Sequence, residues 1–167
     1  MSGCEQITAA VTAWLKERGV EAVDGWSARE RRAMSGPTVV VTVRSCEAGQ
    51  GGFAHYLGER YSQENARWEE LYGRRLEVEL GLDLYAPEGT GQGEMQEMLE
   101  KLMQALTLES PEGLRLEKLC CGELGWDEKQ RRLRQKVTAK YLAWLRAAAA
   151  EDESEFLEFE LRGGWRS

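Results

Sequence analysis

The side chains that could carry out catalysis are few in this sequence. His55 is its one histidine, so an enzyme of the Ser-His-Asp or Cys-His type would have to use it as a base. It follows the flexible stretch 49–52, Gly-Gln-Gly-Gly, and no nucleophile motif lies beside it. A single histidine also leaves a zinc site short of nitrogen ligands. We therefore expect an exposed loop histidine here, with no catalytic or metal-binding role.

The four cysteines do not form a metal or redox motif. They are Cys4, Cys46, Cys120 and Cys121, and no two of them have the C-x-x-C spacing. On a strand, the adjacent Cys120 and Cys121 would point to opposite faces and could not easily reach one metal ion. We expect reduced, partly buried thiols, as is typical of an intracellular chain.

Two glycine-rich stretches are poor matches to phosphate-binding loops. Neither 49–52 nor 89–93 is followed by the Lys-Ser or Lys-Thr of a P-loop. The stretch 89–93 precedes a predicted helix, whose N-terminus would favour an anion, but it lacks the glycine spacing of a dinucleotide site. A plain turn into the helix explains these glycines.

Carboxylates are abundant but match no known site. Glu77 and Glu79 share one face of a predicted strand, where we expect them to be solvated. The acidic run 151–155 could bind a cation weakly, yet its spacing matches no calcium loop. We therefore predict no enzyme, no catalytic residue, no bound metal and no cofactor.

Length and composition indicate one ordinary globular domain spanning 1–167. The chain is 42% hydrophobic and 31% charged, a mix that can bury a core. Its net charge of −7 argues against a general nucleic-acid binder, and the arginine clusters at 29–32 and 131–134 lie beside acids, as on a solvated surface. No apolar run approaches the ~20 residues of a membrane span, and a signal peptide is not expected. We predict an intracellular protein that binds neither specific nucleic acid nor a membrane.

The first half of the chain contains one helix and two clear strands. Residues 3–18 carry an apolar stripe at helical spacing, and 20–23 could be a short strand. The β-branched run 38–43 has apolar residues on both faces, which predicts a central strand. Residues 74–86 alternate, with leucines on one face and charged residues such as Asp83 on the other. This pattern predicts a strand with one core face.

A second helix and another strand follow. The stretch 93–106 has Met95, Met98 and Met103 along its apolar side, where we expect core or interface positions. Residues 114–121 begin the next strand. If strands 74–86 and 114–121 are parallel neighbours, the crossover should be right-handed and the helix should cover one face of the sheet.

The C-terminal third fits two patterns. Residues 125–127 are typical of a turn, and 131–150 has high helix propensity, yet its side chains also alternate as on a strand. We interpret 131–146 and 155–162 as a β-hairpin and keep a helix over 131–150 as the alternative. The predicted fold class is α+β, a mixed, mostly antiparallel sheet with an N-terminal helix and a second helix packed on one face.

The segment 47–73 begins with flexible glycines and continues with charged and aromatic residues. We expect an extended loop or β-arm that orders against a neighbour, because aromatic side chains are costly to leave in water and are enriched at interfaces. The partner interface predicted from these residues, with one tryptophan of a polar stretch further along, comprises Phe53, Tyr56, Tyr61, Trp68, Tyr72 and Trp126.

The order of these parts resembles a known family. The strand from Arg75 ends in Tyr85-Ala86-Pro87 and runs into a helix with a Met/Leu stripe, and the chain later reads Phe159-Glu160-Leu161-Arg162-Gly163. Both segments are similar to those of tail terminator, or tail-to-head joining, proteins of tailed bacteriophages and prophages. The similarity in order covers most of the chain, apart from 47–73. The family has no catalytic signature.

The resemblance implies a structural protein that forms a ring, usually a hexamer, on the end of the growing tail tube. The ring would stop the addition of tube protein and present a surface to the head connector. Its partners would be copies of itself, the tail tube protein and head-tail connector proteins, in the host cytoplasm during assembly and then in the virion tail. The alternatives are another connector or tail-completion protein and, from a different class, a small enzyme or ligand-binding domain.

Overall fold

The computed structural model describes residues 3–25, 34–50, 55–107, 109–129, 131–150 and 156–162, with side chains placed for 5–25, 34–50, 55–107, 109–129 and 131–145. One seven-stranded sheet has the order β1-β2-β4-β6-β5, with β3 also paired to β4 and β7 to β6. The β1–β2 pair is parallel and the other pairs are antiparallel. The elements are α1 (Gly3–Glu17), β1 (Ala22–Asp24), β2 (Thr38–Gln50), β3 (Tyr56–Ser62), β4 (Arg67–Ala86), α2 (Gln92–Thr107), β5 (Leu114–Asp127), β6 (Arg132–Ala150) and β7 (Phe156–Arg162).

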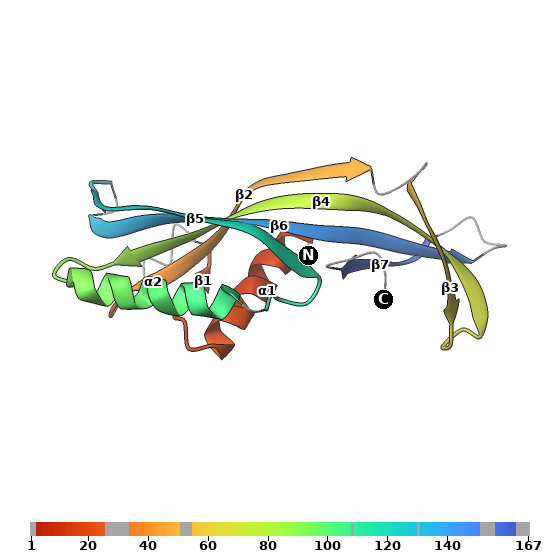
Figure 1. Ribbon diagram of the computed structural model, residues 1–167, viewed down its shortest axis with the longest axis horizontal. Coiled ribbons are helices and arrows are strands. Elements are labelled where there is room, and N and C mark those ends of the chain that lie inside the picture. The colour runs from red at the N-terminus through yellow and green to blue at the C-terminus, as the bar shows by residue number, and fades with distance from the viewer. Residues whose placement is uncertain are drawn as a thin grey trace.

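The long strands β4 and β6 pair with each other and define the long axis of the molecule (Figure 1). On the other side of β4, β2 pairs with residues 74–85 and β3 with residues 67–72. On the other side of β6, β5 pairs with residues 132–143 and β7 with residues 144–149. Each long strand is therefore flanked by two shorter strands placed end to end, which makes the molecule elongated.

Both helices lie on one face of the sheet and over one half of its length (Figure 1). Each buries an apolar stripe against the even-numbered residues of β4, which match the alternation read from the sequence. We call this half the body. Its core includes Ile7, Val11 and Leu15 of α1, Met95, Leu102 and Leu106 of α2, and Val78, Leu80, Leu82 and Leu84 of β4.

The other half of the sheet carries no helix in the part of the chain that is described. Of its placed side chains, Leu71 is the one buried hydrophobic residue. Its described strands are joined by backbone hydrogen bonds along β3, β4, β6 and β7. We call it the arm, and it consists of residues 45–50, 56–62, 67–75, 144–150 and 156–162.

The predicted fold class is confirmed, with strands longer than expected. Strands β6 and β7 pair antiparallel, so the helical alternative for 131–150 is wrong. The turn expected at 125–127 is also wrong, because β5 continues to Asp127. Strands β4 and β5 are not neighbours, because β6 lies between them and pairs antiparallel with both. In the segment 47–73, the described residues include the end of β2, strand β3 and the start of β4, with a turn at 63–66 between β3 and β4.

The sheet face opposite the helices contains a buried carboxylate, Asp83, which is 7% exposed. It accepts hydrogen bonds from the Arg44 guanidinium at 2.5 Å, the Arg134 guanidinium at 2.7 Å and the backbone N–H of Val137 at 3.1 Å. These contacts join β2, β4 and β6. Arg134 was expected on a solvated face of mixed charge. Its side chain is 38% exposed, but its guanidinium binds the buried Asp83 carboxylate together with Arg44.

Gly81 makes room for this ion cluster. A Cβ atom at Gly81 would lie 2.8 Å from the Thr42 hydroxyl oxygen and 3.1 Å from the Arg44 guanidinium carbon. The Arg44 side chain thus crosses the backbone of β4 at Gly81, where no side chain obstructs it. From there its guanidinium reaches Asp83 and also donates to the Thr138 hydroxyl.

Candidate protein interaction site

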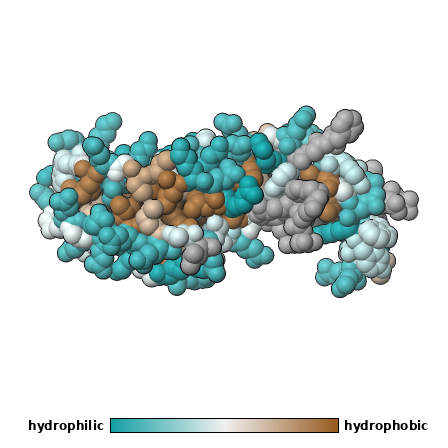
Figure 2. Space-filling model, in the orientation of Figure 1, coloured by the Kyte–Doolittle hydropathy of each residue, from teal (hydrophilic) through white to brown (hydrophobic). Residues whose placement is uncertain are grey.

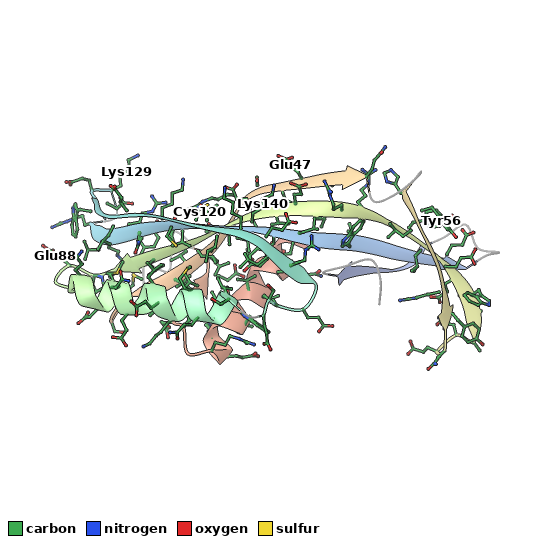
Figure 3. All side chains as sticks on the ribbon, in the orientation of Figure 1. Glu47, Tyr56, Glu88, Cys120, Lys129 and Lys140 are labelled. Atoms are coloured by element: carbon green, nitrogen blue, oxygen red, sulfur yellow. The ribbon has the colours of Figure 1, made fainter. Side chains whose placement is uncertain are left out.

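Four of the predicted interface aromatics lie together on the β3–β4 hairpin at the end of the arm, where Figure 3 labels Tyr56. The register places Tyr61 opposite Trp68 and Tyr56 opposite Tyr72. The rings meet edge to face, with centroids 5.7 Å and 5.6 Å apart in the two pairs. Such cross-strand pairs stabilise a hairpin. Even so, Trp68 remains 54% exposed and Tyr61 52% exposed. We call the surface formed by these four side chains the aromatic face.

Two carboxylates lie between the aromatic pairs. Glu59 and Glu70 are opposite each other in the register. The Tyr72 hydroxyl donates to Glu70 at 2.5 Å, and the Tyr56 hydroxyl donates to Glu59 at 3.3 Å. The bond to Glu70 raises the pKa of Tyr72, while partial burial and the Glu59 carboxylate raise the pKa of Tyr56. Both hydroxyls therefore stay protonated near neutral pH, and the aromatic face carries negative charge between its rings.

A third carboxylate, Glu69, stabilises the hairpin from its opposite face. Glu69 is 2% exposed and accepts hydrogen bonds from the Asn65 amide at 2.9 Å and the Arg60 guanidinium at 3.2 Å. The Asn65 bond, supported by Arg60, holds the pKa of Glu69 below its ordinary value. The backbone N–H of Asn65 also donates to the Ser62 hydroxyl oxygen at 3.2 Å. These bonds tie the turn at 63–66 to both strands, so the aromatic face is presented on an ordered support.

The two other predicted interface residues are Trp126 and Phe53. Trp126 lies in β5 at the far end of the body and is 41% exposed. Phe53 lies outside the described residues. On the body, Met103 of α2 is 38% exposed, and its sulfur lies 3.9 Å from the Cys121 sulfur. The methionine stripe read from the sequence allowed Met103 either a core or an interface position. The stripe alone could not show which methionine faces outward.

Comparison with known proteins assigns this chain to no family. Neither a protein-family model nor a curated protein matches the sequence. Its function is therefore inferred from the side chains and surfaces of the chain itself.

The histidine, the cysteines and the carboxylates were expected to have no catalytic or metal-binding role. Among the described side chains, no group of three His, Cys, Asp or Glu is placed to hold a metal ion. His55 is half-buried at the start of β3 with a φ of 67°, so the prediction of an exposed loop histidine is wrong. Cys46, Cys120 and Cys121 are exposed, where partial burial was expected. Local burial and the neighbouring Cys120 raise the pKa of Cys121, which disfavours its reactive thiolate.

One open hollow of about 520 Å³ lies at the β5–β6 turn and is lined by charges of both signs, including Glu128 and Lys129. In the same lining, a guanidinium nitrogen of Arg134 lies 3.8 Å from a carboxylate oxygen of Asp127. Residues 88–89 form a turn ahead of α2, which begins at Gln92, as the glycines of this stretch predict. Within the described ranges, no helix is long and apolar enough to cross a membrane.

The aromatic face is thus the feature best suited to a specific interaction. Tyrosine and tryptophan are the residues that most often dominate protein interfaces. An exposed cluster of them on a helix-free extension presents apolar area that a protein partner would bury. The two intervening carboxylates would give such a contact polarity and orientation.

Proposed function

We propose that this chain is a structural protein of a bacteriophage or prophage tail, a terminator that forms a ring on the end of the tail tube and joins it to the head. The observation that carries the proposal is the arm, which extends the sheet beyond the helices and ends in the aromatic face. The order of elements in the sequence, which resembles that family, supports the same role.

The energetics of the arm favour a partner. Burial of apolar surface is the main favourable term in folding and in protein association. The body has a core under two helices, whereas the arm buries Leu71 alone among its described hydrophobic side chains. A neighbouring subunit that covered Trp68 and Tyr61 would bury apolar surface that is exposed in the single chain.

A ring provides such a neighbour for every subunit. When each copy contacts the next through two different surfaces, the assembly closes if the rotation between copies divides a full turn. A closed ring on the tube would leave no site for another tube subunit and would offer a new surface to the head connector. The net charge of −7 would keep free subunits apart before they meet the tube.

Electron microscopy of the purified chain, alone and with the tail tube protein of the same phage, tests the proposal. We expect rings, and tubes that stop elongating once capped. The double variant Tyr61→Ala/Trp68→Ala should lose capping, whereas Glu64→Gln, a change in the exposed turn of the same hairpin, should cap as the unmodified chain does. Tubes that keep growing in an excess of the chain would refute the terminator role. Binding to the head connector without capping would instead indicate another head-tail component.

A further inference from the structure

The exposed large hydrophobic side chains of the described residues gather in two places. Tyr56, Tyr61 and Trp68 belong to the aromatic face on the arm. The other two, Met103 and Trp126, belong to the body. Scattered exposed hydrophobic residues need no explanation, but two separate clusters on one chain indicate two contact surfaces.

The second cluster is part of a continuous apolar strip between α2 and the edge strand β5. The register of β5 on β6 places one side of β5 towards the helices, and its residues there are half-buried against the core or exposed. Figure 2 shows a hydrophobic band along this part of the body. We call it the body strip, and it consists of Met103, Leu116, Leu119, Cys121, Leu124 and Trp126.

The sheet leaves one side of the body strip open. Strand β5 is the last strand in the sheet order, so it has a strand partner on one side only within the described part of the chain. Its register shifts twice along β6, between Leu116 and Lys118 and again between Cys121 and Leu124. Such bulges discourage indiscriminate strand pairing at an exposed edge. Side-chain packing on the strip is therefore the more suitable mode of contact.

The two surfaces cannot meet within one chain. Leu119, in the middle of the strip, pairs with Ala139 of β6, and Ala139 pairs on its other side with Leu80 of β4. Leu119 and Leu80 therefore lie at the same height along the sheet. From Trp68 to Leu80 the path along β4 is about 40 Å at ~3.3 Å per residue. The aromatic face and the body strip thus lie in different halves of an elongated molecule (Figures 1 and 3). A second copy of the chain can bring them together, and its own free surfaces then accept further copies.

We propose that the aromatic face of one subunit docks on the body strip of the next. This inference rests on the proposed ring and identifies the two surfaces that build it. The chemistry of the surfaces is complementary, because tyrosine and tryptophan rings pack favourably against the sulfur atoms of Met103 and Cys121. Burying the strip also covers Trp126, which the arm of the same chain cannot reach.

Contact between two aromatic faces is disfavoured by charge. Glu59 and Glu70 lie between the rings, so a two-fold contact of these faces would bring four carboxylates together. None of the six side chains that form the body strip is a carboxylate, although Glu123, Asp127 and Glu128 line the hollow beside Trp126 at one end of it. The contact is therefore head to tail, the type that generates a ring or a filament.

Complementary variants test this arrangement by light scattering. Tyr61→Glu/Trp68→Glu removes the aromatic face and keeps the strip, while Met103→Glu disrupts the strip and keeps the aromatic face. Each variant should be monomeric at a concentration at which the unmodified chain assembles. A mixture of the two should form a dimer and no larger species, because one intact interface remains. Gln104→Glu, which adds the same charge to the next residue of α2, should assemble normally.

Cross-linking provides a second readout. In a chain with Cys4, Cys46 and Cys120 changed to serine, Glu59→Cys, which lies between the aromatic pairs and keeps all four rings, should link to Cys121 of another copy with a short bis-maleimide. The product should be a ladder of covalent multimers, and Cys121→Ser should abolish it.

The outcomes separate this inference from the proposed function. If the unmodified chain assembles but Met103→Glu also assembles, or the mixed variants stay monomeric, the docking is wrong and the ring stands. If the unmodified chain never assembles, alone or on tail tubes, both are refuted.

Discussion

Replacing Asp83 by asparagine should destabilise the body by about 2 kcal/mol, because the change keeps the shape of the side chain and removes its charge. Hydrogen bonds to a charged group contribute about 1.5–3 kcal/mol each, against about 0.5–1.5 kcal/mol for neutral ones. The amide can still accept from the backbone N–H of Val137, but its NH₂ group would face a guanidinium. Because Arg44 and Arg134 are 19% and 38% exposed, water compensates part of the loss, and the value lies below the ~3–5 kcal/mol of a fully buried pair.

The matched control is Glu77→Gln on the same face of the same strand. Glu77 also binds two cations, Lys140 at 2.7 Å and Arg75 at 2.8 Å, but its side chain is 32% exposed. Exposed ion pairs contribute about 0–1 kcal/mol, so the control should change stability by no more than about 0.5 kcal/mol. Comparing the two variants separates the effect of burying a paired carboxylate from the effect of pairing it.

Equilibrium urea unfolding followed by tryptophan fluorescence measures both changes. With a slope of roughly 1–3 kcal/mol per molar urea, Asp83→Asn should lower the unfolding midpoint by about 1 M. All samples must share one low protein concentration, because assembly would stabilise the folded state. A shift for Asp83→Asn no larger than that for Glu77→Gln would refute the reasoning. It would mean that desolvation of the buried charges cancels their attraction.

Three further predictions concern single residues. The lowered pKa of Glu69 means that its hydrogen bonds stabilise the hairpin above the ordinary carboxyl pKa and are lost as pH falls through the folded value. The indole NMR signal of the hairpin tryptophan should therefore change as the pH falls below the ordinary carboxyl pKa. Glu69→Gln should remove this acid transition; a transition that persists in the variant would exclude Glu69 as its cause. Gly81→Ala should lower the free energy of unfolding in urea by about 1–3 kcal/mol, because the added methyl group displaces Arg44. Gly125→Ala on β5, with no atom within 4 Å of the added carbon, should leave the free energy of unfolding unchanged; equal effects would contradict the steric argument. Tyr141 is fully buried, and its hydroxyl has no hydrogen-bond partner among the described residues. Tyr141→Phe should therefore stabilise the chain by about 1 kcal/mol in the same assay. A loss of stability would reveal a hydrogen-bond partner in the rest of the chain.

The sequence by itself determined the elements whose patterns are local. The alternation of 74–86 specified a strand with one core face, and the apolar stripe of 3–18 specified a helix, because a side chain's face depends on its spacing along the chain. The aromatic residues between Tyr56 and Tyr72 predict a contact surface by their chemistry, and this stays a prediction. For the helix and the strand, local spacing was sufficient.

Tertiary structure decided what depends on residues far apart in the chain. Strand β6 separates β4 from β5 because pairing is set by packing across the whole sheet, which local alternation does not encode. Asp83 is buried because Arg44 and Arg134 converge on it from two other strands. Trp126 is separated from the aromatic face because β5 lies against the body. In each case the deciding contact joins segments whose distance in space cannot be read from their distance in sequence.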